Sequence, residues 1–126
     1  MKNQDNNAIL NKSKKFAIRC VNLYNLCKEK SEFVMSKQLL RSGTSIGANI
    51  KEGIRAQTKA DFYAKLCIAL KEASETEYWL EILYETDYIS KDHFENINAD
   101  CTELLKLLTS ICKHKEEKNS IITKQL

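Results

Sequence analysis

The sequence has no proline, and its three glycines all lie between positions 43 and 53. Proline and glycine are the residues that most often interrupt helices, so their scarcity favours long helices over a β-rich or disordered chain. No apolar run approaches the roughly 18 to 20 residues that a membrane-spanning helix needs. The first 15 residues are polar and lack the apolar core of a signal peptide. We therefore expect a cytoplasmic protein that does not cross a membrane.

The residues that usually build catalytic and metal sites are also scarce. The two histidines, His93 and His114, fall at opposite ends of one expected helix, too far apart to share a metal ion or to assist one nucleophile. The Glu-x-x-His motif of di-iron bundles does not occur. Five cysteines form no Cys-x-x-Cys pair and follow apolar stripes, so we interpret all of them as small hydrophobic residues: Cys20, Cys27, Cys67, Cys101 and Cys112. We expect no catalytic residue, no metal and no cofactor; the alternative is a hydrolase that uses Glu52 and Glu77.

What the sequence does contain is a helical pattern repeated four times. Apolar residues recur with a period of about 3.6 in the segments 13–30, 36–57, 58–88 and 90–113. Thr58 and Ser90 stand where N-caps are expected. The connections are short, so neighbouring helices must be antiparallel. We predict an all-α, single-domain, up-and-down antiparallel four-helix bundle over residues 13–113, with a flexible N-terminus (1–12) and a frayed C-terminal tail (114–126).

The second segment combines glycine with a polar strip. Gly43, Gly47 and Gly53 share its core face, where we expect another backbone to approach closely; the alternative is a helix broken at Gly43. Glu77 falls in an apolar sector of the third segment, and a buried carboxylate must be paired or hydrogen-bonded. We therefore predict a structural polar network formed by Ser45, Asn49, Glu52 and Glu77.

Charge is distributed unevenly along the chain. Residues 1–59 contain twelve Lys and Arg against four Asp and Glu, a net charge of +8, whereas residues 60–126 contain eight against thirteen, a net charge of −5. This asymmetry indicates an electrostatic partner or self-assembly; the alternative is two ordinary solvated surfaces. On the first two helices the basic side chains line up in a way suited to phosphates, and they predict weak RNA or DNA binding without sequence preference: Lys12, Lys15, Arg19, Lys37, Arg41, Lys51 and Arg55.

The third segment is apolar on a second side as well. Ala64, Ile68, Trp79 and Ile82 lie outside the sector expected to face the core. An exposed apolar patch that contains tryptophan usually marks an interface, so these residues predict a homo-oligomer. The alternative is that Trp79 covers a loop.

Two stretches resemble a known family. Residues 38–53 (QLLRSGTSIGANIKEG), together with residues 61–63 (DFY) and 70–80 (LKEASETEYWL), look like the signature of the four-helix-bundle family named after the bacterial 23S ribosomal RNA intervening-sequence protein. The resemblance covers residues 16 to about 111. It implies a ring-shaped homopentamer without enzymatic activity. A related group, the accessory variability determinants of diversity-generating retroelements, binds nucleic acid and a reverse transcriptase. A scaffold for a protein partner, such as a reverse transcriptase or a ribosome-associated protein, is therefore the alternative function.

Overall fold

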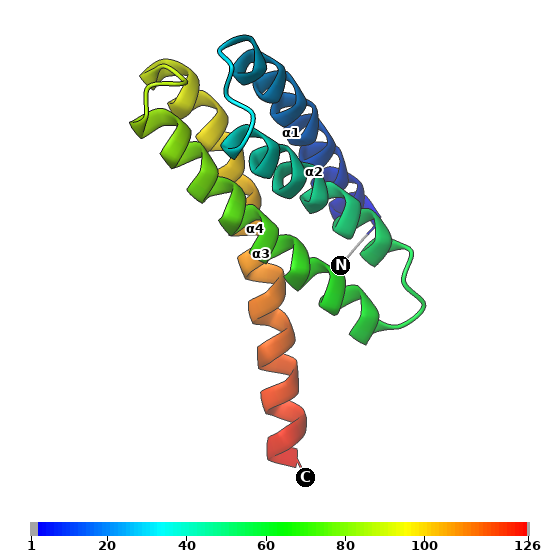
Figure 1. Cartoon of the computed structure of the whole chain (residues 1–126). Coiled ribbons are helices and arrows are strands. Elements are labelled where there is room, and N and C mark those ends of the chain that lie inside the picture. Colours follow the sequence, from blue (N-terminus) through cyan, green and yellow to red (C-terminus); the bar gives the residue numbers. More distant parts are fainter. Residues whose placement is uncertain (1–2, 126) are drawn as a thin grey trace.

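The computed structural model describes the backbone of residues 3–125 and the side chains of residues 4–115. Over this part of the chain it contains four helices and no strand: α1 (Asn3–Glu29), α2 (Met35–Ile54), α3 (Lys59–Glu85) and α4 (Lys91–Gln125). Each helix packs against its neighbours in the chain, and α4 returns to α1 over a smaller contact (Figure 1). The prediction of an all-α, up-and-down four-helix bundle is confirmed. None of the helices in the described residues is both long and apolar enough to cross a membrane.

The ends of the bundle differ from the prediction. Residues 3–12, predicted as a flexible N-terminus, are helical and form the first turns of α1, and the apolar stripe continues back to Ile9, which is 3% exposed. Residues 1 and 2 lie outside the described part. The tail predicted to fray from residue 114 is helical to Gln125, since no proline or glycine interrupts it. Figure 1 shows that this part of α4 leaves the bundle and projects beyond it. Leu126 also lies outside the described part.

One apolar core joins all four helices. Each helix contributes a stripe of fully buried side chains, and the largest of them are Phe16, Leu23, Leu39, Ile46, Ile50, Leu66, Leu80, Leu83, Ile97, Leu104 and Leu108. These stripes repeat with helical spacing, as the periodicity predicts. The core sets the rotation of each helix about its axis and therefore decides which polar side chains face outward.

The glycines of α2 lie where neighbouring helices come close. A methyl group built on Gly43 would overlap the sulfur of Cys20, and one built on Gly53 would lie 2.5 Å from Leu66 Cδ2. At Gly47 the nearest atom is Ser13 Oγ, at 3.2 Å. Backbone atoms of Ser13 and Phe62 lie within 3.5 Å of the methyl groups built on Gly47 and Gly53, so the predicted approach of another backbone is confirmed at these two glycines, whereas the atoms nearest to Gly43 belong to side chains. The helix α2 runs through Gly43 without a break.

Side chains and left-handed residues close the helix ends. The hydroxyl of Thr58 accepts the Asp61 N–H at 3.1 Å and Ser90 accepts the His93 N–H at 3.1 Å, so both predicted N-caps are confirmed. At the ends of α1 and α3, Ser31 and Asp87 have φ angles of 62° and 66°. This left-handed conformation is the one that glycine most often supplies after a helix.

The interpretation of the cysteines needs one correction. Cys67 on α3 and Cys112 on α4 are joined by a disulfide, with their Cα atoms 5.8 Å apart. Cys20, Cys27 and Cys101 are free and buried, as small hydrophobic residues would be. The pairing could not be inferred from spacing, because it depends on the register between two helices 45 residues apart in sequence.

Candidate nucleic-acid interface

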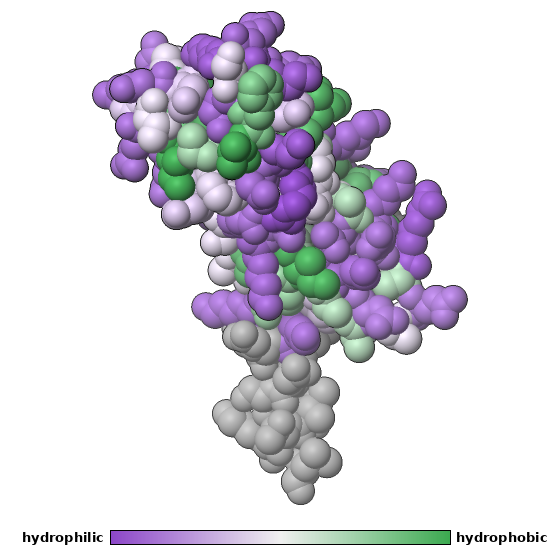
Figure 2. Space-filling view, viewed as in Figure 1, coloured by the Kyte–Doolittle hydropathy of each residue, from purple (hydrophilic) through white to green (hydrophobic). Residues whose placement is uncertain are grey.

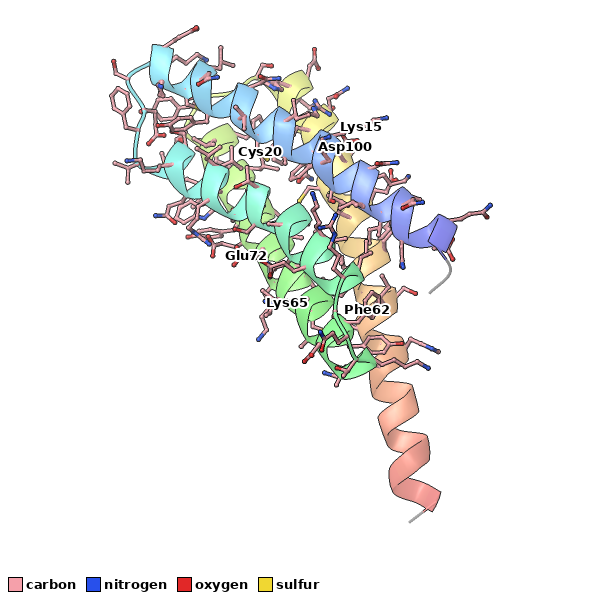
Figure 3. All side chains as sticks on the ribbon, turned by 90° about the vertical axis from the view of Figure 1, so that its right-hand side faces the viewer. Lys15, Cys20, Phe62, Lys65, Glu72 and Asp100 are labelled. Atoms are coloured by element: carbon pink, nitrogen blue, oxygen red, sulfur yellow. A yellow bond between two sulfur atoms is a disulfide. The ribbon has the colours of Figure 1, made fainter. Side chains whose placement is uncertain are left out.

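On the edge of α1 that faces α4, basic side chains form ion pairs with carboxylates of α4. Lys12 pairs with Glu103, and Arg19 donates to Asp100 Oδ2 at 2.7 Å. Lys15 lines the same hollow between α1 and α4, together with Asp100 and Glu103, and Figure 3 labels Lys15 and Asp100 side by side there. Sequence reasoning aligned these cations correctly on one edge of α1. It did not show that acidic residues of α4 lie opposite them.

Arg41 on α2 forms ion pairs with carboxylates of α3 in the same way. Its guanidinium contacts Glu72 at 3.2 Å and also pairs with Glu75. The indole N–H of Trp79 donates to Glu75 at 3.0 Å. This hydrogen bond and the Arg41 guanidinium together hold the pKa of Glu75 below its usual value. Arg41 therefore belongs to a charged cluster that ties α2 to α3.

The remaining predicted cations have no carboxylate partner among the described side chains. Lys37 and Lys51 are exposed on α2, Arg55 is exposed directly after its last residue, and Lys15 is exposed on α1. Sequence reasoning missed Lys14, which is also exposed and has no ion pair within residues 4–115. It lies on the α2 side of α1, and the contact between Ser13 and Gly47 that fixes this orientation is visible only in the structure.

Lys14 of α1 and Lys51 of α2 both line a groove between these two helices. The groove has a volume of about 380 Å³, and no Asp or Glu among the described side chains lines it. We call it the α1–α2 groove; its lining residues are Leu10, Asn11, Lys14, Ala17, Thr44, Gly47, Ala48 and Lys51. Ala17, Gly47 and Ala48 have small or no side chains, which leaves space between the two helices there. The groove therefore combines two cations, an amide and a hydroxyl on a surface that a polyanion can reach.

The predicted polar network is not formed. The Ser45 hydroxyl donates to the backbone oxygen of Arg41 at 2.6 Å, Asn49 donates to the backbone oxygen of Ser45 at 2.8 Å, and Glu52 pairs with Lys65 at 2.9 Å. Glu77 instead lies on the α4 side of α3. There its charge adds to the effect of burial, which raises the pKa of Cys101 on α4 to about 12. Glu52 pairs with Lys65, twelve residues before Glu77 on α3, so the two carboxylates of the hydrolase alternative lie about three helical turns apart.

The buried polar contact between α2 and α3 is made by other residues. Thr76 donates to the Ser42 hydroxyl at 2.8 Å, and both side chains are fully buried. No cluster of three or more His, Cys, Asp or Glu side chains that could hold a metal ion is found among the described residues.

The residues predicted for an oligomer interface lie on the outward side of α3. Ala64 is exposed and Ile68 is 41% exposed, whereas Trp79 and Ile82 are half-buried. Tyr78, which was not predicted, is 55% exposed beside them. On the face in Figure 2, green hydrophobic side chains form several patches with purple hydrophilic ones between them. The oligomer interface stays a prediction.

Comparisons with known proteins place the chain in a family. Residues 5–110 match the family described as "23S rRNA-intervening sequence protein". A crystal structure of a protein of unknown function from the S23 ribosomal protein family of Bacteroides thetaiotaomicron VPI-5482 is 61% identical. The match covers 83% of this chain and 98% of that one, with a TM-score of 0.81. No protein with a curated description matches the chain. The chain therefore belongs to the 23S rRNA-intervening sequence protein family.

Proposed function

We propose that the protein is a non-enzymatic cytoplasmic protein that binds RNA or DNA weakly, and without sequence preference, through phosphates held in the α1–α2 groove. The observation that carries the proposal is that Lys14 and Lys51 line this groove and no carboxylate does. Lys37, exposed on α2, and Arg55, exposed directly after its last residue, extend the positive charge along the same helix. Neutralising phosphates with such side chains releases counterions, which supplies most of the free energy of non-specific binding.

The ion-paired cations contribute less to this proposal. A phosphate that contacted Lys12, Arg19 or Arg41 would have to compete with carboxylates of α4 or α3. The proposed interface therefore rests on the cations that have no such partner. The name of the family refers to 23S ribosomal RNA, so a ribosomal RNA fragment is the first ligand to test.

The test measures the affinity for a labelled RNA at several salt concentrations, with fluorescence anisotropy as the readout. We expect the double variant Lys14→Glu, Lys51→Glu to bind at least tenfold more weakly at low salt. The slope of log K against log salt should also fall by about 0.7 for each lost phosphate contact. The matched control is Lys71→Glu, Lys106→Glu, which changes the net charge equally at exposed positions of α3 and α4. If the wild type does not bind at low salt, or both double variants lose the same affinity, the proposal is wrong.

Homo-oligomerisation is a second candidate property, and a pentamer is the form that family resemblance implies. It is supported by the exposed apolar side chains of Ile68 and Tyr78 on the outward side of α3. The α1–α2 face is basic, whereas α3 carries Glu75, Glu81 and Glu85. Two different faces of opposite charge suit the head-to-tail contact that every ring requires.

Light scattering coupled to size exclusion tests this candidate. We expect an oligomeric wild type and a smaller particle for Trp79→Glu. A monomeric wild type at micromolar concentration would exclude self-assembly and favour the alternative, in which this side of α3 binds a different protein such as a reverse transcriptase or a ribosome-associated protein. An oligomer that persists in Trp79→Glu would place the interface elsewhere.

A further inference from the structure

Three hollows adjoin at the end of the bundle where α2 connects to α3. The first is the α1–α2 groove. The second lies beside the α2–α3 connection, and its wall includes Asn6, Gly53, Lys59 and Phe62. Phe62 also lines the third, which lies between α3 and α4. Asn6 is one helical turn before Leu10 of the α1–α2 groove, and Phe62 is common to the second and third hollows, so the three follow one another around this end of the molecule; we call this series the path.

This path differs from the other hollows in its charge. Among the side chains of residues 4–115, no Asp or Glu lines any of its three parts. The hollow between α1 and α4 includes Asp100 and Glu103, and the one on the outer side of α4 includes Glu95 and Glu103. A polyanion that follows the path would thus meet lysines without the repulsion of a carboxylate in the wall.

The third hollow is built from aromatic rings. It has a volume of about 280 Å³ and is lined by Phe62, Tyr63, Ser110, Ile111 and His114. The ring of Tyr63 meets that of Phe62 edge to face at 5.2 Å between centroids. The ring of His114 lies 6.5 Å from that of Tyr63 and is tilted by 49°, so the two rings form an open wedge. We call this hollow the aromatic pocket.

The fold keeps the aromatic pocket in place. Figure 3 shows Phe62 beside α4 near the point where that helix leaves the bundle. Cys112 lies within one turn of Ile111 and His114, and its disulfide to Cys67 ties this part of α4 to α3. His114 is exposed and Tyr63 is half-buried, so a ligand can reach both rings.

We propose that the aromatic pocket takes an unpaired base of a single-stranded nucleic acid whose phosphates lie in the α1–α2 groove. The inference rests on the proposed function, because the groove supplies the contacts to the backbone. The rings of Tyr63 and His114 are 6.5 Å apart and tilted by 49°, so a flat base can stack on the face of one ring while its edge contacts the other. Bases in a duplex are already stacked and paired, so the pocket selects single strands. Stacking is tolerant of base identity, and Ser110 adds a single hydroxyl to the wall, so little sequence preference is expected.

The experiment compares two single-stranded probes of about ten nucleotides, one with bases and one abasic, which carry the same number of phosphates. Binding is measured by anisotropy, and stacking is measured by the quenching of a 2-aminopurine base. The wild type should bind the base-bearing strand about tenfold more tightly than the abasic strand. Tyr63→Leu should remove this difference and the quenching, with the salt slope unchanged. Tyr63→Phe should keep both, because it retains an aromatic face. Phe33→Leu, which removes an exposed aromatic ring from the connection between α1 and α2, is the matched control and should behave as the wild type.

The outcomes separate this inference from the proposed function. If the wild type binds both strands equally and in a salt-dependent way, the proposed role of the aromatic pocket is wrong, whereas phosphate binding in the α1–α2 groove stands. Tyr63→Leu that weakens both strands equally would also overturn it, since the effect would then be on folding or on backbone contacts. Binding of neither strand at low salt would contradict the proposed function and the inference together. A duplex bound as tightly as the base-bearing strand would overturn the selection of single strands.

Discussion

Glu32 closes the start of α2, and its removal tests the account of how the first two helices are connected. Its carboxylate is in a side chain only 6% exposed, and it accepts the backbone N–H groups of Val34, Met35 and Ser36 at 3.0, 2.9 and 2.8 Å. The first N–H groups of a helix have no partner within the helix. In Glu32→Ala, the amides of Val34 and Met35 can bond to water, whereas that of buried Ser36 cannot. One unsatisfied buried donor costs about 1–3 kcal/mol, and the lost charge at the helix N-terminus adds about 0.5–1 kcal/mol.

We therefore expect Glu32→Ala to lower the free energy of unfolding by about 2–4 kcal/mol. For a chain of this length each kcal/mol corresponds to roughly 4 °C, so the Tm should fall by about 8–16 °C. Circular dichroism during thermal and urea unfolding measures the change in Tm and in the free energy of unfolding. The control is Glu29→Ala, an exposed glutamate at the end of α1, which should change stability by less than about 0.5 kcal/mol.

The same capping contact makes a prediction about pH. Burial alone would raise the pKa of Glu32, but the N–H groups of Met35, Ser36 and Val34 outweigh it and hold the pKa below its usual value of 4.5. A carboxylate whose pKa is lower in the folded state stabilises the protein above its unfolded pKa, and this stabilisation is lost as the pH falls through the folded pKa. The Tm difference between wild type and Glu32→Gln should be largest near pH 7 and shrink below about pH 4. An equally large difference at pH 3, or a Glu32→Ala variant as stable as the control, would refute the reasoning.

Three further changes test other parts of the fold. Gly43→Ala should destabilise by about 2 kcal/mol, despite a gain of about 1 kcal/mol in helix propensity, because the added methyl overlaps buried Cys20; urea unfolding measures the difference. Asp87→Gly should raise the Tm by a few degrees, because it relieves about 1 kcal/mol at a φ of 66°; an unchanged or lower Tm in calorimetry would contradict this. Reduction with dithiothreitol should lower stability by about 2–4 kcal/mol, and the double variant Cys67→Ser, Cys112→Ser should be equally less stable and insensitive to the reductant.

Periodicity predicted the architecture because burial of apolar stripes is the main constraint on a helical bundle. The caps at Thr58 and Ser90 and the close approach at Gly47 and Gly53 follow from local chemistry and were predicted for that reason. The start of α1 lies at Asn3 and not at the predicted Ser13, because Ile9, within the short apolar stretch at residues 8–10, is buried only through its contacts with the neighbouring helices.

The charged residues show what periodicity leaves undetermined. A helical wheel places Arg19 and Lys14 on different sides of α1, but only the packed bundle shows that Asp100 lies opposite Arg19 and that no carboxylate lines the groove at Lys14. Glu77 was assigned to the wrong neighbour for the same reason. The helical wheel of α3 correctly predicts that Glu77 lies partly inside the bundle. The rotation of α3 about its axis places this side chain on the α4 side, and not on the α2 side where the network was predicted.

The aromatic pocket could not be predicted, because its rings are distant in sequence. Tyr63 and His114 come together only after α3 and α4 pack in one register, which the Cys67–Cys112 disulfide also fixes. Neither residue belongs to an aromatic-rich motif. Their proximity is therefore a property of the fold and not of any local segment.

The most direct test of the central claim is a map of the residues that contact nucleic acid in solution. Two-dimensional NMR spectra of the ¹⁵N-labelled protein, recorded during titration with a single-stranded ribosomal RNA fragment, report on every backbone amide. The account predicts that the largest shifts occur at Asn11, Lys14, Thr44 and Lys51 and diminish as salt is added. Shifts confined to the outward side of α3 around Ile68, or no shifts at low salt, would contradict it.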